Sequence, residues 1–365
     1  MSTSQRLCRF GSLLLLPCGL MIASLALPGQ AAQRPTKSAA AKKEADDTAT
    51  KKAEAAKRDS KPAGPKSDQD EKSKPQAHDF DTADGVLIAA TYFPPLRPGK
   101  DVPVVMLLHG YGEKQSVFWP TGSDRDLAFA LQDKGYAVLT FDFRGHGHST
   151  SRVGAALRPP DAKGGPAGGK LDFRDLGTRI SFATLLDDIE AAKRFLVQRN
   201  DAGELNLAKL GLVGCELGAS MAVLWSFQDW QFVPQVGFTG KQGQDVQSLV
   251  LVSPQYNFKG IAITNQLTFM QKAVPMLVVV GKKDSKAFGE ADKMYQATRK
   301  ARPSSGESDS KLVDLNTKLQ GGKLLNPDPE LDLNVDKELI AFFDQTLKRK
   351  AAKWEKRKTE GDTGN

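Results

Sequence analysis

The sequence has 365 residues, of which 40% are hydrophobic and 26% charged, so it can form a sizeable core while part of it stays solvated. The net charge is +8, but residues 79–347 hold 30 basic and 32 acidic residues, so the positive excess lies in the terminal segments. This distribution argues against a nucleic-acid-binding protein. The three cysteines, Cys8, Cys18 and Cys215, are too few for a disulfide framework or a cysteine-rich metal site.

Residues 1–32 have the pattern of a signal peptide. Arg6 and Arg9 precede an apolar run that extends to Leu27, and small residues follow at a suitable cleavage position. We therefore expect an exported protein, periplasmic or extracellular. The alternative is an uncleaved membrane anchor, because an apolar run of about 18 residues is just long enough to cross a bilayer.

Residues 33–78 form a second segment, rich in Lys, Ala, Asp, Ser and Pro. Such a composition cannot bury enough apolar surface to offset the entropy of ordering, so we predict a disordered, charged linker. A plain spacer is one interpretation. The other is a tether that contacts the membrane or another surface of the cell envelope.

Residues 79–347 are predicted to form the folded domain. Short, continuous apolar runs alternate there with amphipathic segments, which is typical of strands buried on both faces of a parallel sheet and of helices that cover them. The pattern predicts an α/β fold with a doubly wound, mostly parallel sheet. The predicted strands are residues 104–108, 137–141, 210–213, 248–252, 276–280 and, more weakly, 311–315; the predicted helices are residues 124–134, 182–198 and 336–347.

The last segment, residues 348–365, contains seven basic residues and three acidic ones. We predict a basic, flexible tail that keeps the protein soluble or contacts the envelope surface.

Four motifs follow predicted strands. They are His109-Gly110-Tyr111-Gly112, the segment from Asp142 to Ser149, Gly214-Cys215-Glu216-Leu217-Gly218, and Gly281-Lys282-Lys283-Asp284. In this order, each at the end of a strand, the motifs resemble those of the α/β-hydrolase superfamily, in particular its lipase, esterase and serine-peptidase-like branch. The resemblance covers roughly residues 85–347.

The resemblance implies a role for particular residues. In this superfamily a strand–turn–helix of the form Gly-x-nucleophile-x-Gly carries the nucleophile. Here the nucleophile position is Glu216, and Asp284 matches the acid position. The N–H groups of Tyr111 and Leu217 would form the oxyanion hole. Cys215 is one residue from the apex, so we interpret it as a small buried hydrophobic residue.

The sequence departs from the family at two of the three catalytic positions. No Gly-x-Ser-x-Gly motif occurs, and no histidine follows His148. Gln320 lies at or near the position of the family's histidine, and an amide cannot accept and return a proton near neutral pH. The catalytic triad is therefore predicted to be degenerate.

Glu216 itself admits several interpretations. Its carboxylate, at a helix N-terminus, could occupy the oxyanion hole. Glu216 and Asp284 could instead form an acid/base pair around Gln320, or hold a metal together with His109, although the spacing matches no recognised metal motif. We expect no metal and no cofactor. His109, Trp230 and Phe232 are candidate ligand-binding residues. The two aromatic ones either line a pocket above the elbow or pack into the core, and the core interpretation is favoured because apolar residues are mostly buried.

Three functions remain open on the sequence alone. The first is a pseudo-hydrolase that binds an unknown small molecule or protein ligand. The second is an active hydrolase, acting on ester, amide or epoxide-type substrates, that uses Glu216 and Asp284. The third is a structural protein tethered to the cell envelope by its linker and tail.

Overall fold

The computed structural model describes residues 73–123, 125–152, 170–232, 241–302, 309–325 and 334–357. The predicted signal peptide and nearly all of the predicted linker lie outside these residues. All described residues belong to the unit that begins at Pro65.

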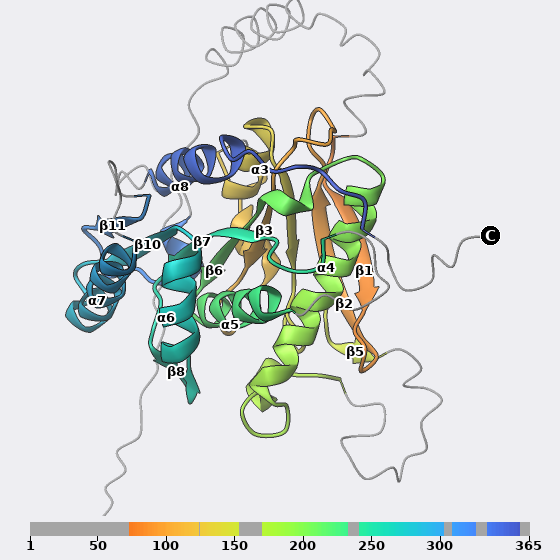
Figure 1. Cartoon of the computed structure of the whole chain (residues 1–365). Helices are drawn as coiled ribbons and strands as arrows, with labels where there is room; N and C mark the ends of the chain where they lie inside the picture. Colours follow the sequence, from red (N-terminus) through yellow and green to blue (C-terminus); the bar gives the residue numbers. More distant parts are fainter. Residues whose placement is uncertain are drawn as a thin grey trace, which may run out of the picture. The chain divides into compact units, whose positions relative to one another are not determined.

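A mixed, nine-stranded sheet forms the centre of the domain (Figure 1). Its strands pair in the order β1-β2-β4-β3-β6-β7-β10-β11, and β5 pairs with β2. The strands from β4 to β11 are parallel, whereas β1, β2 and β5 are antiparallel to their neighbours. The bounds are β1 Gln76–Asp81, β2 Val86–Phe93, β3 Val104–Leu108, β4 Ala137–Phe141, β5 Ser151–Arg152, β6 Leu210–Cys215, β7 Val246–Val252, β10 Met276–Gly281 and β11 Lys311–Leu315.

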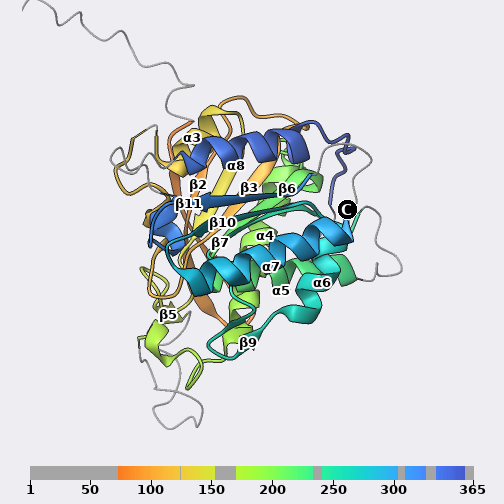
Figure 2. The same cartoon turned by 90° about the vertical axis from the view of Figure 1, so that its left-hand side faces the viewer.

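Helices cover both faces of this sheet (Figure 2). One face carries α3 (Leu127–Asp133) and α8 (Val335–Phe343). The other carries α4 (Leu185–Asp201), α5 (Leu217–Gln231), α6 (Thr264–Ala273) and α7 (Ser285–Ala301). A short hairpin of β8 (Asn257–Phe258) and β9 (Ile261–Ala262) precedes α6. The α/β-hydrolase-type architecture predicted from the sequence is confirmed, and the antiparallel strands β1, β2 and β5 extend it at one end.

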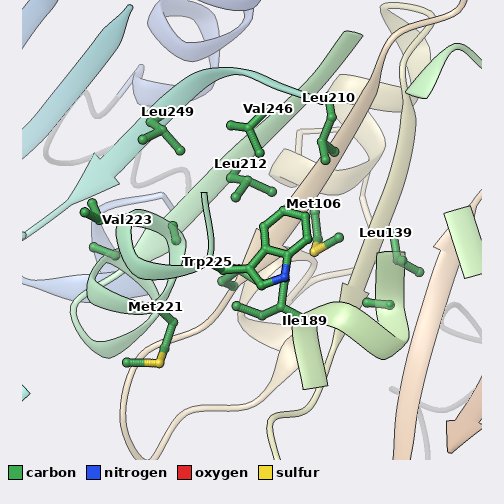
Figure 3. Packing of buried hydrophobic residues seen from close by; sticks show 14 of the residues in the cluster. Met106, Leu139, Ile189, Leu210, Leu212, Met221, Val223, Trp225, Val246 and Leu249 are labelled. Atoms are coloured by element: carbon green, nitrogen blue, oxygen red, sulfur yellow. The ribbon is translucent and has the colours of Figure 1, made fainter. Parts of the chain in front are cut away.

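Most of the parallel strands contribute alternate side chains to two hydrophobic cores, and Val278 and Val280 of β10 belong to a smaller third cluster. In β3, Met106 and Leu108 join the core beneath α4, α5 and α6, whereas Val105 and Leu107 join the core beneath α3 and α8. Trp225 of α5, 2% exposed, lies among strand residues in the first core (Figure 3). Both faces of the parallel part of the sheet are therefore shielded from water, which explains why its strands appear in the sequence as continuous apolar runs.

The beginning of the predicted basic tail is ordered, contrary to the prediction. Residues 348–357 lie against the amino-terminal edge of the sheet. Asn206 Nδ2 donates a hydrogen bond of 3.0 Å to the Ala352 carbonyl, and the Arg357 guanidinium pairs at 2.7 Å with the fully buried Asp245. These contacts make residues 348–357 an ordered C-terminal strap, and the tail prediction is wrong for them because a buried carboxylate holds the arginine.

None of the described helices is both long and apolar enough to cross a membrane. The loops at the carboxyl ends of β3, β6, β7 and β10 meet at one edge of the sheet, opposite the C-terminal strap. In open α/β sheets ligands bind at this edge, so the motif residues are gathered where a site is expected.

Candidate active site

The turn between β6 and α5 is a sharply bent elbow. Its apex, Glu216, has φ 46° and ψ −104°, a conformation that side chains rarely adopt. The flanking glycines are needed for close packing. A side-chain carbon on Gly218 would lie 2.3 Å from the Leu108 carbonyl oxygen, and one on Gly214 would lie 2.4 Å from the Gly218 oxygen. The strand–turn–helix elbow predicted from the sequence is therefore present, with a glutamate at its apex.

The Glu216 carboxyl group lies beside a second carboxyl group, that of Glu113. A side-chain carbon on Gly110 would be 2.8 Å from Glu113 Oε2 and 3.0 Å from Glu216 Oε2. Both carboxyl oxygens therefore lie close to the same position beside Gly110. Gly321 borders the pair as well, because a carbon there would be 3.2 Å from Glu216 Cδ. Glu113 was not predicted from the sequence; its position directly after the His109–Gly112 motif was the available signal.

The two carboxyl groups differ in their hydrogen bonds. Glu113 accepts the Gly110 N–H at 2.8 Å and the Gly322 N–H at 3.2 Å. Within the described part of the chain, no donor bonds to the half-buried Glu216 carboxyl group. Burial and the charge of Glu113 raise the pKa of Glu216, and Lys323 opposes this shift. Glu216 thus holds a proton more readily than an ordinary glutamate does.

The predicted oxyanion-hole donors have no acceptor among the described residues. This holds for the N–H groups of both Tyr111 and Leu217, and Glu216 makes no side-chain cap to α5. The hypothesis that the Glu216 carboxylate fills the oxyanion hole therefore lacks the hydrogen bond it requires. The Tyr111 ring packs against Phe173 at 5.3 Å, and the Lys259 ammonium lies over it at 4.2 Å.

Asp284 and Gln320 meet as the acid and histidine positions of a triad would. Gln320 Nε2 donates a 2.5 Å hydrogen bond to Asp284 Oδ2, while Asp284 Oδ1 caps α7. The next residue, Gly321, donates its N–H at 3.0 Å to Ser253 Oγ and borders Glu216. Three positions predicted from the sequence, Glu216, Asp284 and Gln320, are thus brought to one edge of the sheet.

His109 does not bind a ligand as predicted, because it is fully buried and both of its ring nitrogens are committed to the backbone. Nδ1 lies 2.7 Å from the Gly110 oxygen, and Nε2 accepts the Phe143 N–H at 3.0 Å. Burial lowers the pKa of His109 to about 3, so the ring is neutral. It cannot serve as the metal ligand considered above, and no three His, Cys, Asp or Glu side chains of the described residues are grouped to hold a metal.

Trp230 and Phe232 are also placed differently from the prediction. Trp230 Nε1 donates to the oxygen of Val246, the first residue of β7, and Phe232 is 45% exposed beside a cavity that includes Asp245. Both lie toward the amino-terminal edge of the sheet because α5 carries the chain away from the elbow. Neither aromatic residue is near Glu216.

His146 braces the loop that follows β3. Its Nε2 accepts the Gly112 N–H at 3.1 Å, and its Nδ1 lies 3.2 Å from the Arg144 oxygen. The Phe173 ring stacks on the imidazole with centroids 5.0 Å apart. Burial lowers the pKa of His146, and both of its ring nitrogens are occupied in holding the backbone. Cys215 is fully buried, as expected, and burial raises the pKa of its thiol.

The fold and the elbow together define an α/β-hydrolase. Residues 99–309 match the family model described as serine aminopeptidase, S33, which is more than half of the chain. The chain therefore belongs to this family. The match includes the elbow and Asp284 but ends before Gln320.

Solved structures with the same fold include two esterases. An esterase from Pyrococcus furiosus is 16% identical, with 78% of this chain and 96% of that chain covered and a TM-score of 0.50. A thermostable carboxyl esterase from Bacillus coagulans is 11% identical, with 75% and 99% covered and a TM-score of 0.50. At these identities the likeness concerns the fold. No curated protein matches the sequence.

Proposed function

We propose that this chain is an exported pseudo-hydrolase, in which the triad has degenerated and the former active site binds a small molecule or a partner. The observation that carries the proposal is the hydrogen bond between Gln320 and Asp284. The two residues stand at the acid and histidine positions, but they cannot relay a proton, because an amide is neither a base nor an acid near neutral pH.

The other histidines do not replace the missing base. His109 and His146 use both ring nitrogens in contacts with the backbone, so neither has a lone pair left for a substrate. His78 lies on β1, at the far end of the sheet from β6. The exposed His148 imidazole makes no hydrogen bond with a described residue that would orient it.

The second candidate is an active hydrolase, and the raised pKa of Glu216 favours it. A protonated Glu216 could act as a general acid, and the N–H groups of Tyr111 and Leu217, which have no acceptor among the described residues, could bind a developing oxyanion. An ionised Glu216 could attack an epoxide or ester and form a covalent intermediate. Release of that intermediate needs an activated water, for which Gln320 supplies no base.

Turnover separates the two candidates. The mature chain, from residue 33, would be assayed on p-nitrophenyl acetate, leucine p-nitroanilide and styrene oxide, beside the variant Glu216→Gln. The pseudo-hydrolase predicts no difference between the two proteins on any substrate and no labelling by a fluorophosphonate, which reacts with activated serines. Turnover that is lost in Glu216→Gln would overturn it in favour of the active hydrolase.

Export rests on residues 1–32, and the tethering function on the linker and the tail. Fractionation of cells that express the full chain would test export, because a processed, non-cytoplasmic protein is expected. Deletion of residues 33–72, which leaves β1 intact, would release the domain from the envelope if the linker tethers it. An unchanged location after this deletion would contradict the structural-tether hypothesis and leave the linker as a spacer.

A further inference from the structure

A cavity of about 730 Å³ adjoins the elbow on the side of Glu113. This volume is in the range of pockets that hold small organic ligands, about 300–1,000 Å³. Glu216 is not among its described lining residues, but Glu113, whose carboxyl group lies beside that of Glu216, is one of them. Its lining residues are Gly112, Glu113, Lys114, Ser116, Val117, Trp119, Pro120, His146, Gly147, Phe173 and Lys323.

The free charges in this cavity are positive. Lys114 and Lys323 both line it, and neither makes an ion pair with a described residue. Among the described lining residues the one carboxylate is that of Glu113, which already accepts the N–H groups of Gly110 and Gly322. His146 adds no charge because its Nε2 accepts a hydrogen bond. The described lining residues therefore carry one negative and two positive charges, and both lysine side chains are exposed to solvent.

The remaining wall is apolar. Trp119 is fixed by an edge-to-face contact with Phe93, at 5.4 Å between centroids, and Phe173 is fixed by its stacking on His146 at 5.0 Å. Rigid aromatic walls offer contact area to an apolar group at little entropic cost. A ligand that matches both parts of the cavity has an apolar body and an anionic end.

We propose that this cavity binds a small amphipathic carboxylate, with its anionic end at Lys114 and Lys323 and its apolar body along Trp119 and Phe173. The inference rests on the proposed function and deepens it, since it names the class of ligand that binds beside Glu216. A cationic ligand is the competing outcome. The cavity disfavours it because Glu113 is already hydrogen-bonded and the two ammonium groups would repel it.

Calorimetric titration of the mature chain with three matched probes tests the charge preference. Octanoate, octanamide and octylamine share one apolar chain and differ in the charge of the end group. We expect octanoate to bind most tightly. Lys114→Gln and Lys323→Gln should each weaken octanoate binding by about twofold to fivefold, the range for partly exposed ion pairs. Lys134→Gln is the control, because Lys134 is exposed and follows α3 at the amino-terminal edge.

Three results would overturn the proposal. They are tightest binding of octylamine or octanamide, equal octanoate affinity in the two cavity variants and the control, and no measurable octanoate binding up to its solubility limit. Octanoate has no bond to hydrolyse, so its binding is scored independently of turnover. A failure of this inference is therefore distinguishable from a failure of the proposed function.

Discussion

The double variant Glu216→Ser with Gln320→His should restore hydrolytic activity if the triad has degenerated in place. The elbow keeps its bent backbone at residue 216, and Asp284 already accepts a hydrogen bond from the side chain at residue 320. The two substitutions would therefore supply the nucleophile and the base beside the acid position that is already present.

The size of the effect follows from the geometry. An intact serine triad contributes about 10⁶-fold to kcat. The 2.5 Å contact between residues 284 and 320 indicates that the base would be held correctly by the acid. The two new side chains would not be optimally aligned with each other, and a misplacement of about 1 Å lowers the rate by about 10²-fold. We therefore expect a gain of about 10²-fold to 10⁴-fold over either single variant.

Initial rates with p-nitrophenyl acetate, a small ester that makes few demands on specificity, would measure this gain. The single variants Glu216→Ser and Gln320→His are the controls, because triad members act as a unit and each alone should stay near the wild-type rate. Labelling by a fluorophosphonate should appear in the double variant. A folded double variant that is no faster than both single variants would refute the argument that the three positions remain aligned.

Three further predictions concern stability. Gly218→Ala should destabilise the domain by about 2–3 kcal/mol in urea unfolding, because the added carbon lies 2.3 Å from a β3 carbonyl oxygen, whereas the helical control Gly289→Ala has nothing within 4 Å and should be neutral or stabilising. The raised pKa of Glu216 means that its ionised form destabilises the folded state; this effect is complete above the folded-state pKa and absent below the unfolded-state pKa. Glu216→Gln should therefore raise the Tm at about pH 8 and leave the Tm unchanged at about pH 4. Equal shifts of the Tm at the two pH values would contradict this. Arg357→Met should lower the unfolding free energy by about 3 kcal/mol by leaving a buried carboxylate short of its main partner, and the exposed control Arg349→Met should have little effect.

The fold was predictable because its sheet is buried on both faces. Strands of that kind appear as continuous apolar runs, and the runs at residues 104–108 and 276–280 correspond to β3 and β10. The antiparallel strands β1 and β2 were not predicted. They lie at one end of the sheet, and their burial alternates along the chain, which makes a weaker sequence signal.

The site was predictable only where a motif fixes the position along the chain. Glu216, Asp284 and Gln320 follow strands, and their place at the carboxyl edge is set by topology. Glu113 is held in the site partly by the N–H of Gly322, a residue 209 positions away, and no local sequence pattern encodes that contact.

The wrong predictions have a geometric cause. Trp230 and Phe232 follow the elbow closely in sequence, but α5 has 15 residues and so spans about 22 Å, which carries its end to the opposite edge of the sheet. The C-terminal strap was missed for the opposite reason. Arg357 belongs to a basic segment that appears solvated in the sequence, and its partner Asp245 is distant along the chain.

The C-terminal strap also decides how the protein can be attached to a support. Because Arg357 is anchored to Asp245 at the amino-terminal edge, a tag fused directly after Arg357 emerges on the side of the sheet away from Glu216. Coupling to a sensor chip through such a tag leaves the elbow and the neighbouring cavity facing the solution. Immobilisation at this end therefore suits ligand screening, since the support does not cover the surface under test.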